Sequence, residues 1–348
     1  MSSMDANTDL ILFFNNASNS LNYYLSIFII IFGIIGNILN ILVLSQRSLR
    51  SNSSAIYFLA SAIVGIIVII SGLISRMLSA CNLDLTLTID WICKVRNFIL
   101  YNSRTIFLWM IVLATIDRWL SSSISINLRS MSNLKNVQRS IIIILIYSCL
   151  INIPILYCYK ANLSDILRAC YGSTYSCRLT TDLIYAFGTV LLPLLLMIIF
   201  GLLTIKNVRH LQSRVHAING VMISLENRTL SSNKSGHLPA KKTDRQLLKM
   251  LLVQVTLLFL FTSPHAIQKV YSSFASSPPS GSLDNAVQNF IFTILTLIAL
   301  AASGTPFYIY TLTGGSVFRN ALRHLVKVVI QKCYYVPINR LNRMRETK

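Results

Sequence analysis

The chain has 348 residues, of which 54% are hydrophobic and only 12% are charged. Ordinary globular chains carry about 25% charged residues, so this chain has too few charges to cover the surface of a soluble protein. The formal net charge of +20 would suit nucleic-acid binding. We exclude that function because the basic residues flank apolar segments, where they indicate the orientation of a membrane protein.

Seven apolar segments are long enough to cross a bilayer, which takes about 20 residues in a helix. They lie at about residues 23–44, 55–78, 91–120, 140–159, 183–203, 247–271 and 289–312. Pro264 and Pro306 fall in the sixth and seventh, where membrane helices tolerate proline as a kink. The sequence therefore predicts an all-α membrane protein: an extracellular segment (1–22), a seven-transmembrane helix bundle (23–312), and a short amphipathic eighth helix with a basic tail (313–348).

Lys and Arg are concentrated on one side of the predicted bundle, above all in the tail and in the long third loop at about 204–246. Acidic residues predominate among the loops on the other side. Because cytoplasmic loops carry the excess of Lys and Arg, we expect a plasma-membrane protein with its N-terminus outside. Sequons at Asn16 and Asn162 fall on the outer side, where glycosylation takes place.

The seven cysteines show no spacing typical of zinc ligands, and we expect neither a metal nor another cofactor. Four of them lie on the outer side, where disulfides persist: Cys81, Cys93, Cys170 and Cys177. Cys93, at the start of the third span, is expected to bridge to the loop before the fifth. Cys149 and Cys158 are interpreted as packing residues. Cys333 follows a basic stretch and is either a palmitoylation site or an inert thiol.

Single residues at fixed places in the spans carry further information. They are Gly36-Asn37 in the first span, Asp117-Arg118-Trp119 at the end of the third, Pro193 in the fifth, Pro264 in the sixth, and Thr305-Pro306-Phe307-Tyr308-Ile309-Tyr310 in the seventh. Their order and spacing, over about residues 20–330, resemble the rhodopsin-like (class A) G-protein-coupled receptors. The stretch from Pro306 to Arg319 also resembles that of invertebrate FMRFamide-type neuropeptide receptors.

This resemblance implies a receptor that binds an extracellular ligand and activates a heterotrimeric G protein, with arrestin and a receptor kinase as further partners. We expect no enzyme, because no nucleophile–base pair or phosphate-binding loop stands out. The family's usual distance from the fifth-span proline favours Cys170 over Cys177 as the partner of Cys93. Cys81 and Cys177 are then the candidates for a second bridge.

The chain departs from the family pattern inside the bundle. Thr262 stands where the family usually has tryptophan, and Thr305 stands where it usually has asparagine. The second-span aspartate of the family corresponds to Ile63 in this count, and Phe107 replaces a small polar residue. A hard cation needs oxygen ligands, so we expect no sodium site.

Arg118 is expected to act as an activation switch. A charge within a span is costly and must find a partner. The resemblance implies that Arg118 pairs with Asp117 and Asp244 at rest. Agonist would move the sixth span about Pro264 and break the pair with Asp244, while Pro306 belongs to the same switch. The alternative is that Asp117 and Arg118 are interfacial charges that extend toward water.

Arg104 lies in the outer half of the third span, where an intramembrane charge normally faces the bundle interior or a wet cavity. It either anchors an acidic group or a C-terminal amide of the ligand, or acts as a structural hub with Asn102, Ser103 or backbone carbonyls. Further candidate ligand contacts share this outer half: Leu100, Tyr101, His265, Gln268, Lys269, Gln288 and Phe292. Lys94 and Arg96, near the mouth, are interpreted as steering acidic ligands.

Two ligand classes are disfavoured. Amine receptors of the family place an aspartate where Leu100 stands, and opsins place a lysine where Ala299 stands. A peptide is therefore the favoured ligand, and a small-molecule chemosensory receptor on the same fold is the alternative. A transporter or channel is less favoured, because the two halves show no repeat and no ring of acidic residues suggests a pore.

Overall fold

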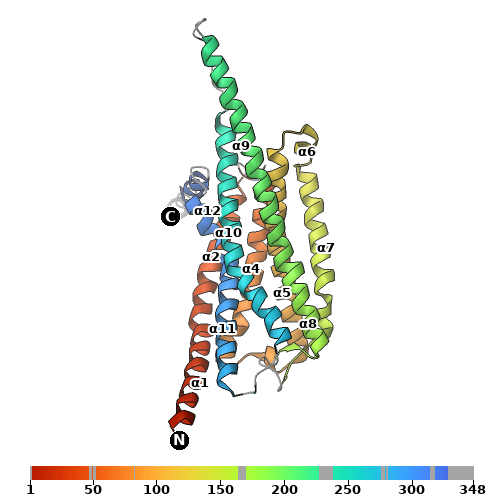
Figure 1. Cartoon of the computed structure of the whole chain (residues 1–348), viewed down its shortest axis with the longest axis vertical. Coiled ribbons are helices and arrows are strands. Elements are labelled where there is room, and N and C mark those ends of the chain that lie inside the picture. Colours follow the sequence, from red (N-terminus) through yellow and green to blue (C-terminus); the bar gives the residue numbers. More distant parts are fainter. Residues whose placement is uncertain are drawn as a thin grey trace, which may run out of the picture.

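The computed structural model describes residues 2–46, 49, 52–81, 83–163, 170–226, 238–275, 279, 281–313 and 318–327, with side chains left out of the description at 2–6, 211–226 and 238–248. Within these residues, seven helices are long and apolar enough to cross a membrane, which confirms the predicted seven-helix bundle. Figure 1 shows the helices running side by side along one axis.

The first half of the bundle consists of α1 (Ser2–Ser20), η1 (Leu21–Leu25), α2 (Ser26–Leu44), α4 (Ser53–Ala80), η2 (Leu85–Leu87), α5 (Asp90–Ser122), α6 (Ile126–Ser130) and α7 (Leu134–Cys158). The second half consists of the strands β1 (Tyr159–Lys160) and β2 (Tyr171–Gly172), then α8 (Tyr175–Leu183), η3 (Ile184–Leu191), α9 (Leu192–Glu226), α10 (Leu238–Phe274), α11 (Leu283–Ala301), η4 (Ala302–Gly304) and α12 (Pro306–Thr313). Each predicted span corresponds to one helical segment, although η3 is a π-helix inside the fifth and η4 a 3-10 turn inside the seventh.

The two ends of the bundle differ, and we name them by their elements. The hairpin end carries the N-terminus and the antiparallel pair β1–β2, while α6 and the long extension of α9 lie at the opposite α6 end (Figure 1). Asn52, Asn133 and Ser282 each precede a helix and accept a hydrogen bond from the backbone N–H of Ser54, Asn136 and Asn285, respectively. Such side chains satisfy N–H groups that have no partner inside the helix, which fixes where α4, α7 and α11 begin.

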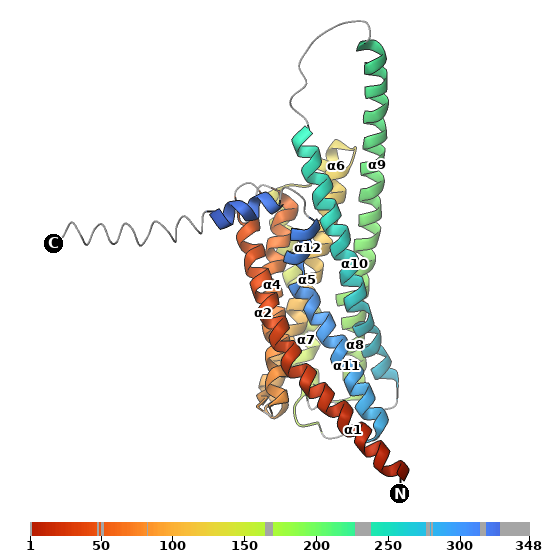
Figure 2. The ribbon, with the colours of Figure 1, turned by 90° about the vertical axis from the view of Figure 1, so that its left-hand side faces the viewer.

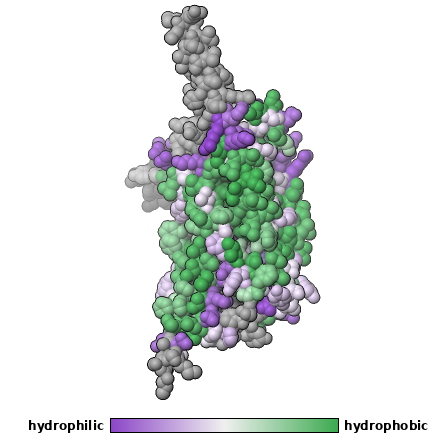
Figure 3. Space-filling view, viewed as in Figure 1, coloured by the Kyte–Doolittle hydropathy of each residue, from purple (hydrophilic) through white to green (hydrophobic). Residues whose placement is uncertain are grey.

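The outer surface of the bundle is apolar. On α7, the side chains of Ile142, Ile143, Ile146 and Leu150 are exposed, and Figure 3 shows a broad hydrophobic band with hydrophilic residues toward both ends. A soluble protein rarely exposes such a large apolar area. The band therefore faces the acyl chains of a bilayer, as the low charge content predicts.

The first, second and seventh spans approach one another unusually closely. A Cβ atom built on Gly304 would lie 2.7 Å from the Cα of Gly33, and one built on Gly33 would lie 2.6 Å from the Cδ1 of Ile69. Asn37 donates hydrogen bonds to the carbonyls of Gly33 (2.8 Å) and Ser303 (3.1 Å). Glycine at 33 and 304 thus lets two backbones touch where the seventh span changes to a 3-10 turn.

The first span continues at the hairpin end as one long helix. α1, η1 and α2 give a membrane-length segment over Asn7–Leu44, of 38 residues, which is longer than a bilayer requires. α1 leans against α11, where the rings of Phe14 and Phe290 lie 5.4 Å apart (Figure 2).

After α12, residues 318–327 are helical and turn away from the bundle axis (Figure 2). Phe318 is buried against the rings of Phe307 and Tyr310, and Gln46 donates to the carbonyl of Ala321 at 2.9 Å. The charged side chains of this segment point outward: Arg319, Arg323 and Lys327. Cys333 lies outside the described residues.

Candidate functional site

A cavity of about 320 Å³ opens at the hairpin end of the bundle. Its walls come from α1, η1, α4, α5, η3, α10 and α11, and the β1–β2 hairpin covers part of it. Five of the eight predicted ligand contacts line it: Arg104, Leu100, Tyr101, His265 and Phe292. Gln268, Lys269 and Gln288 are absent from its lining.

A chain of aromatic side chains forms one wall of this cavity. The Tyr185 hydroxyl lies 2.9 Å from His265 Nδ1, and the His265 ring lies 5.6 Å from the ring of Phe292. The guanidinium of Arg104 lies 5.7 Å from the Tyr185 ring centroid, and that of Arg76 lies 5.7 Å from the Phe292 ring centroid. Tyr185 belongs to the π-helix η3, a kind of irregularity that is frequent at functional sites.

Arg104 is only 4% exposed, and its Nε and Nη2 atoms have no hydrogen-bond partner among the described residues. Asn102 and Ser103 were the side chains expected to bond Arg104 if its role were structural, and neither of them bonds to Arg104. Ser103 donates to the carbonyl of Ile99 in its own helix at 2.7 Å, and Asn102 donates toward Cys149 Sγ at 3.7 Å. Arg104 therefore brings a buried guanidinium with unfilled donors to the cavity.

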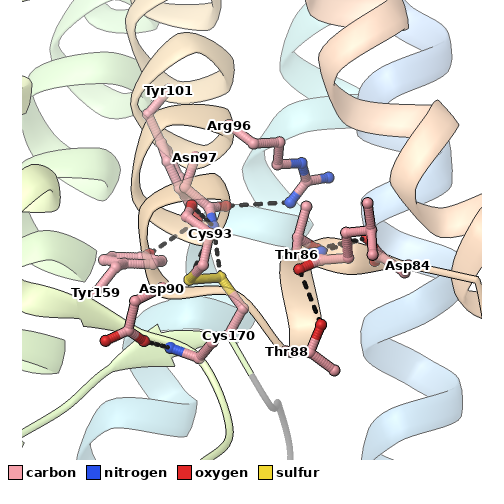
Figure 4. The surroundings of a disulfide bond; sticks show 12 residues. Asp84, Thr86, Thr88, Asp90, Cys93, Arg96, Asn97, Tyr101, Tyr159 and Cys170 are labelled. Atoms are coloured by element: carbon pink, nitrogen blue, oxygen red, sulfur yellow. Dashed lines mark hydrogen bonds between the residues drawn. A yellow bond between two sulfur atoms is a disulfide. The ribbon is translucent and has the colours of Figure 1, made fainter.

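Arg96 also lines the cavity, but its donors are occupied. Its guanidinium donates to the carbonyls of Ser71 (2.8 Å) and Gly72 (3.2 Å) and to the side chain of Asn97 (3.1 Å). Figure 4 shows Arg96 pointing away from the disulfide toward the neighbouring helix. This arginine ties α5 to α4, a role that the expectation of a steering charge at the mouth missed.

The roof of the cavity is held by two disulfides. One joins Cys93 to Cys170, the pairing that the resemblance implies, and Asn97 donates to Cys170 Sγ beside it (Figure 4). The second joins Cys158 to Cys177, so the expected Cys81–Cys177 bridge is wrong, and so is the interpretation of Cys158 as a packing residue.

The β1–β2 hairpin explains why Cys177 pairs with Cys158 and not with Cys81. Cys158 ends α7 immediately before β1, and its carbonyl accepts from Ser173 N just after β2. Cys177 follows in the first turn of α8, so that the two Cα atoms are 5.3 Å apart. Cys81 is free and exposed at the end of α4.

Beside the cavity lies a buried ion pair. Lys269 Nζ is 2.6 Å from Asp182 Oδ1 and donates to the Tyr101 hydroxyl at 2.7 Å. Ser273 and Tyr171 donate to the other carboxylate oxygen of Asp182. Lys269 is 1% exposed, so its charge serves to join α10 to α8 rather than to line the cavity.

At the α6 end, Arg118 contacts the residues at the start of α4. Its Nη2 donates to Asn52 Oδ1 and its Nε to Ser54 Oγ, both at 2.5 Å, and its Nη2 lies 3.5 Å from Asp117 Oδ2. Asp117 in turn accepts from Ser54 and, at 2.6 Å, from Ser132. The sequence indicated the Asp117 partner and missed the two partners on α4.

The sixth and seventh spans meet at the same end. Tyr310 donates to Gln254 Oε1 at 2.5 Å, and both side chains are buried. Pro264 lies inside α10 and Pro306 begins α12, where the sequence places the kinks. Asp244 belongs to α10, but its side chain lies outside the described residues, so its pairing with Arg118 stays a prediction.

The position expected for the family's second-span aspartate needs correction. Ile63 is 48% exposed on the outer surface of the bundle and does not face the interior. Gly65 does: a Cβ built on it would lie 3.0 Å from Asn37 Oδ1 and 3.1 Å from the Ser303 carbonyl. Since glycine also offers no side-chain oxygen, the expectation of no sodium site stays a prediction on this corrected basis.

Seven membrane-length helices, a cavity at one end and an arginine–carboxylate cluster at the other define a seven-helix membrane receptor. A family model described as 7 transmembrane receptor (rhodopsin family) matches residues 36–310. The chain therefore belongs to the rhodopsin family of seven-transmembrane receptors, and the expectations of a receptor and of a multi-pass membrane protein are confirmed. No curated protein matches the chain.

Proposed function

We propose that the chain is a plasma-membrane receptor that binds an extracellular peptide in the cavity and activates a heterotrimeric G protein. The observation that carries this proposal is the unfilled guanidinium of Arg104 in the cavity, about four turns before the Arg118 cluster on the same helix. A ligand at the first site and a G protein at the second would communicate through α5 and the helices packed on it.

In the proposed switch, α10 has two positions relative to α5 and α12, one at rest and one with agonist bound. Arg118 is bonded to Asn52 and Ser54 at rest, and Asp244 on α10 is its proposed further partner. Movement of the part of α10 between Pro264 and the α6 end would also separate Gln254 from Tyr310. A ligand drives such a change only by binding the second arrangement more tightly than the first.

A peptide is favoured because the cavity opens at the hairpin end beside the N-terminal helix. The resemblance of the stretch from Pro306 to Arg319 to FMRFamide-type receptors also supports a peptide. A small-molecule chemosensory receptor is the second candidate, since about 320 Å³ falls within the range of small-molecule pockets.

The remaining assignments follow the same orientation. The hairpin end lies outside the cell, with glycans on Asn16 and Asn162, and the α6 end meets the G protein, arrestin and receptor kinase. The helix at 318–327 lies along the inner membrane surface, with palmitoylation at Cys333 as an additional anchor. Rhodopsin-family receptors are typically not enzymes, and we assign this chain no catalytic role.

The first test measures nucleotide exchange on a panel of G proteins in membranes from cells that express the full chain. Pooled neuropeptides are the probe. We expect exchange with wild type and its loss in Arg118→Ala with ligand binding retained, while Arg104→Ala loses both. Arg139→Ala removes an exposed arginine from the same end of the bundle and is the control, which should keep exchange.

Absence of exchange with every peptide, at confirmed surface expression, would contradict the proposed peptide. A response to small molecules that depends on Arg118 would then establish the second candidate. A response that survives Arg118→Ala would contradict the proposed switch, because the cluster at the α6 end would not be required.

A further inference from the structure

The charges around the cavity are unbalanced. Among the described lining residues there are three arginines, Arg76, Arg96 and Arg104, and one carboxylate, Asp84. The negative charge of Asp84 acts on Arg96, whose donors are already occupied. Arg104 lies about two turns further along α5 than Arg96, and no described carboxylate forms an ion pair with it.

Arg104 is the centre of this excess. It is more than nine-tenths buried, and two of its nitrogens have no partner among the residues that the structure describes. A buried charge without a partner is strongly unfavourable, and removal of one member of a buried pair leaves the protein in the same condition. A bound anion would supply the missing partner, and the planar guanidinium fork fits a carboxylate with two parallel hydrogen bonds.

The wall next to Arg104 shows what the rest of the ligand should be. Tyr185, His265 and Phe292 form a continuous aromatic surface, and Arg76 stands at its other end, where it also donates to Asn22 at 3.2 Å. A ring or other apolar group would pack on this surface. A cationic group would meet like charges at both ends, and an amide would leave the charge of Arg104 uncompensated.

We propose that this cavity binds a carboxylate-bearing ligand with an apolar or aromatic body, and that Arg104 is the anchor of the carboxylate. The inference rests on the proposed function for its role in signalling, and it selects an acidic group over the amide that the sequence left open. Binding itself can be tested without a G protein.

The test uses three probes that share one carbon skeleton and differ in charge: 3-phenylpropionate, 3-phenylpropionamide and 3-phenylpropylamine. Thermal unfolding of the purified full chain in lipid nanodiscs is measured at constant ionic strength, with each probe at up to about 10 mM, because fragments of this size bind in the millimolar range. We expect the acid to raise the unfolding midpoint by about 2 °C or more, and the amide and the amine to leave it unchanged.

Two variants and a matched control locate the effect. Arg104→Gln and Arg104→Met should lose the shift that the acid gives. Lys135→Gln removes one exposed positive charge near the start of α7, at the α6 end and away from the cavity, and should keep the shift. Without any probe, Arg104→Met should unfold at the same temperature as wild type or higher, because it removes a buried charge that lacks a partner.

Several results would overturn the proposal. They are no shift with the acid, an equal or larger shift with the amide or amine, an acid shift that persists in both Arg104 variants, or a lower midpoint of unliganded Arg104→Met. Failure of this proposal is distinguishable from failure of the proposed function. If the acid shifts the unfolding midpoint but no ligand stimulates nucleotide exchange, only the proposed coupling to a G protein is contradicted. If an amidated or basic peptide stimulates exchange and the acid gives no midpoint shift, only the proposed carboxylate site is contradicted.

Discussion

The ion pair between Lys269 and Asp182 is among the most deeply buried charges that the structure describes, at 1% and 0% exposure. Desolvation of two charges is costly, and the cost is offset only when both groups are fully hydrogen-bonded. Tyr101, Tyr171 and Ser273 provide the additional hydrogen bonds. The cluster therefore fixes how α5, α8, α10 and the hairpin meet around the cavity.

Removal of one partner should be far more damaging than removal of both. We expect Asp182→Asn to lower the free energy of unfolding by about 3–5 kcal/mol, because Lys269 then stays buried without a countercharge. The double variant Asp182→Leu with Lys269→Met should recover most of the loss. Thermal unfolding of the purified receptor measures both, and Ser273→Ala, expected to cost about 1 kcal/mol, is the control. A single variant as stable as this control would show that the pair contributes little.

Sequence identified the individual charges of the site better than their partners. Arg104 and Arg118 stand out because a charge within an apolar run is costly wherever it lies. Arg76 gives the same signal near the end of the second span and was missed. The Lys269–Asp182 pair could not be predicted from the sequence. It depends on which faces of α8 and α10 meet, and the spacing of residues along a single helix does not indicate which faces meet.

At the scale of the elements, all seven spans could be predicted, because their length and hydropathy are imposed by the bilayer. The irregular turns within them could not. No pattern of residues within Ile184–Leu191 or Ala302–Gly304 indicates that the first is a π-helix and the second a 3-10 turn. The second disulfide was missed for a related reason, since its geometry follows from a hairpin with only two residues in each strand.

The contact between the first and seventh spans gives a prediction for an element. Gly304→Ala would place a Cβ 2.7 Å from the backbone of Gly33, so one helix must move. We expect a loss of about 1–3 kcal/mol in the free energy of unfolding, measured by thermal unfolding. Gly201→Ala is the control, because its Cβ would meet only a Leu252 side-chain atom at 3.5 Å. Equal stability of the two variants would show that the spans separate at low cost.

At the scale of the whole molecule, the proposed orientation predicts which sequons carry glycans. Asn16 on α1 and Asn162 beside the hairpin are both exposed at the hairpin end. We expect Asn16→Gln and Asn162→Gln each to remove one glycosidase-sensitive increment of mass from the chain expressed in animal cells. Asn227 and Asn233 also begin sequons, but they fall in the third loop, which is predicted to be cytoplasmic. Asn227→Gln and Asn233→Gln should therefore change nothing, and loss of a glycan in either variant would show that the proposed orientation is wrong.

The long first helix has a mechanical consequence. A helix of 38 residues measures about 57 Å, whereas the hydrocarbon core of a bilayer is about 30 Å thick, so nearly half of its length stands beyond the membrane. By geometry, a small tilt of this span would produce a larger displacement at its far end. A spin label at Asp9 paired with one at Asp284 would therefore report, in one distance distribution, how the first and seventh spans shift against each other when a ligand arrives.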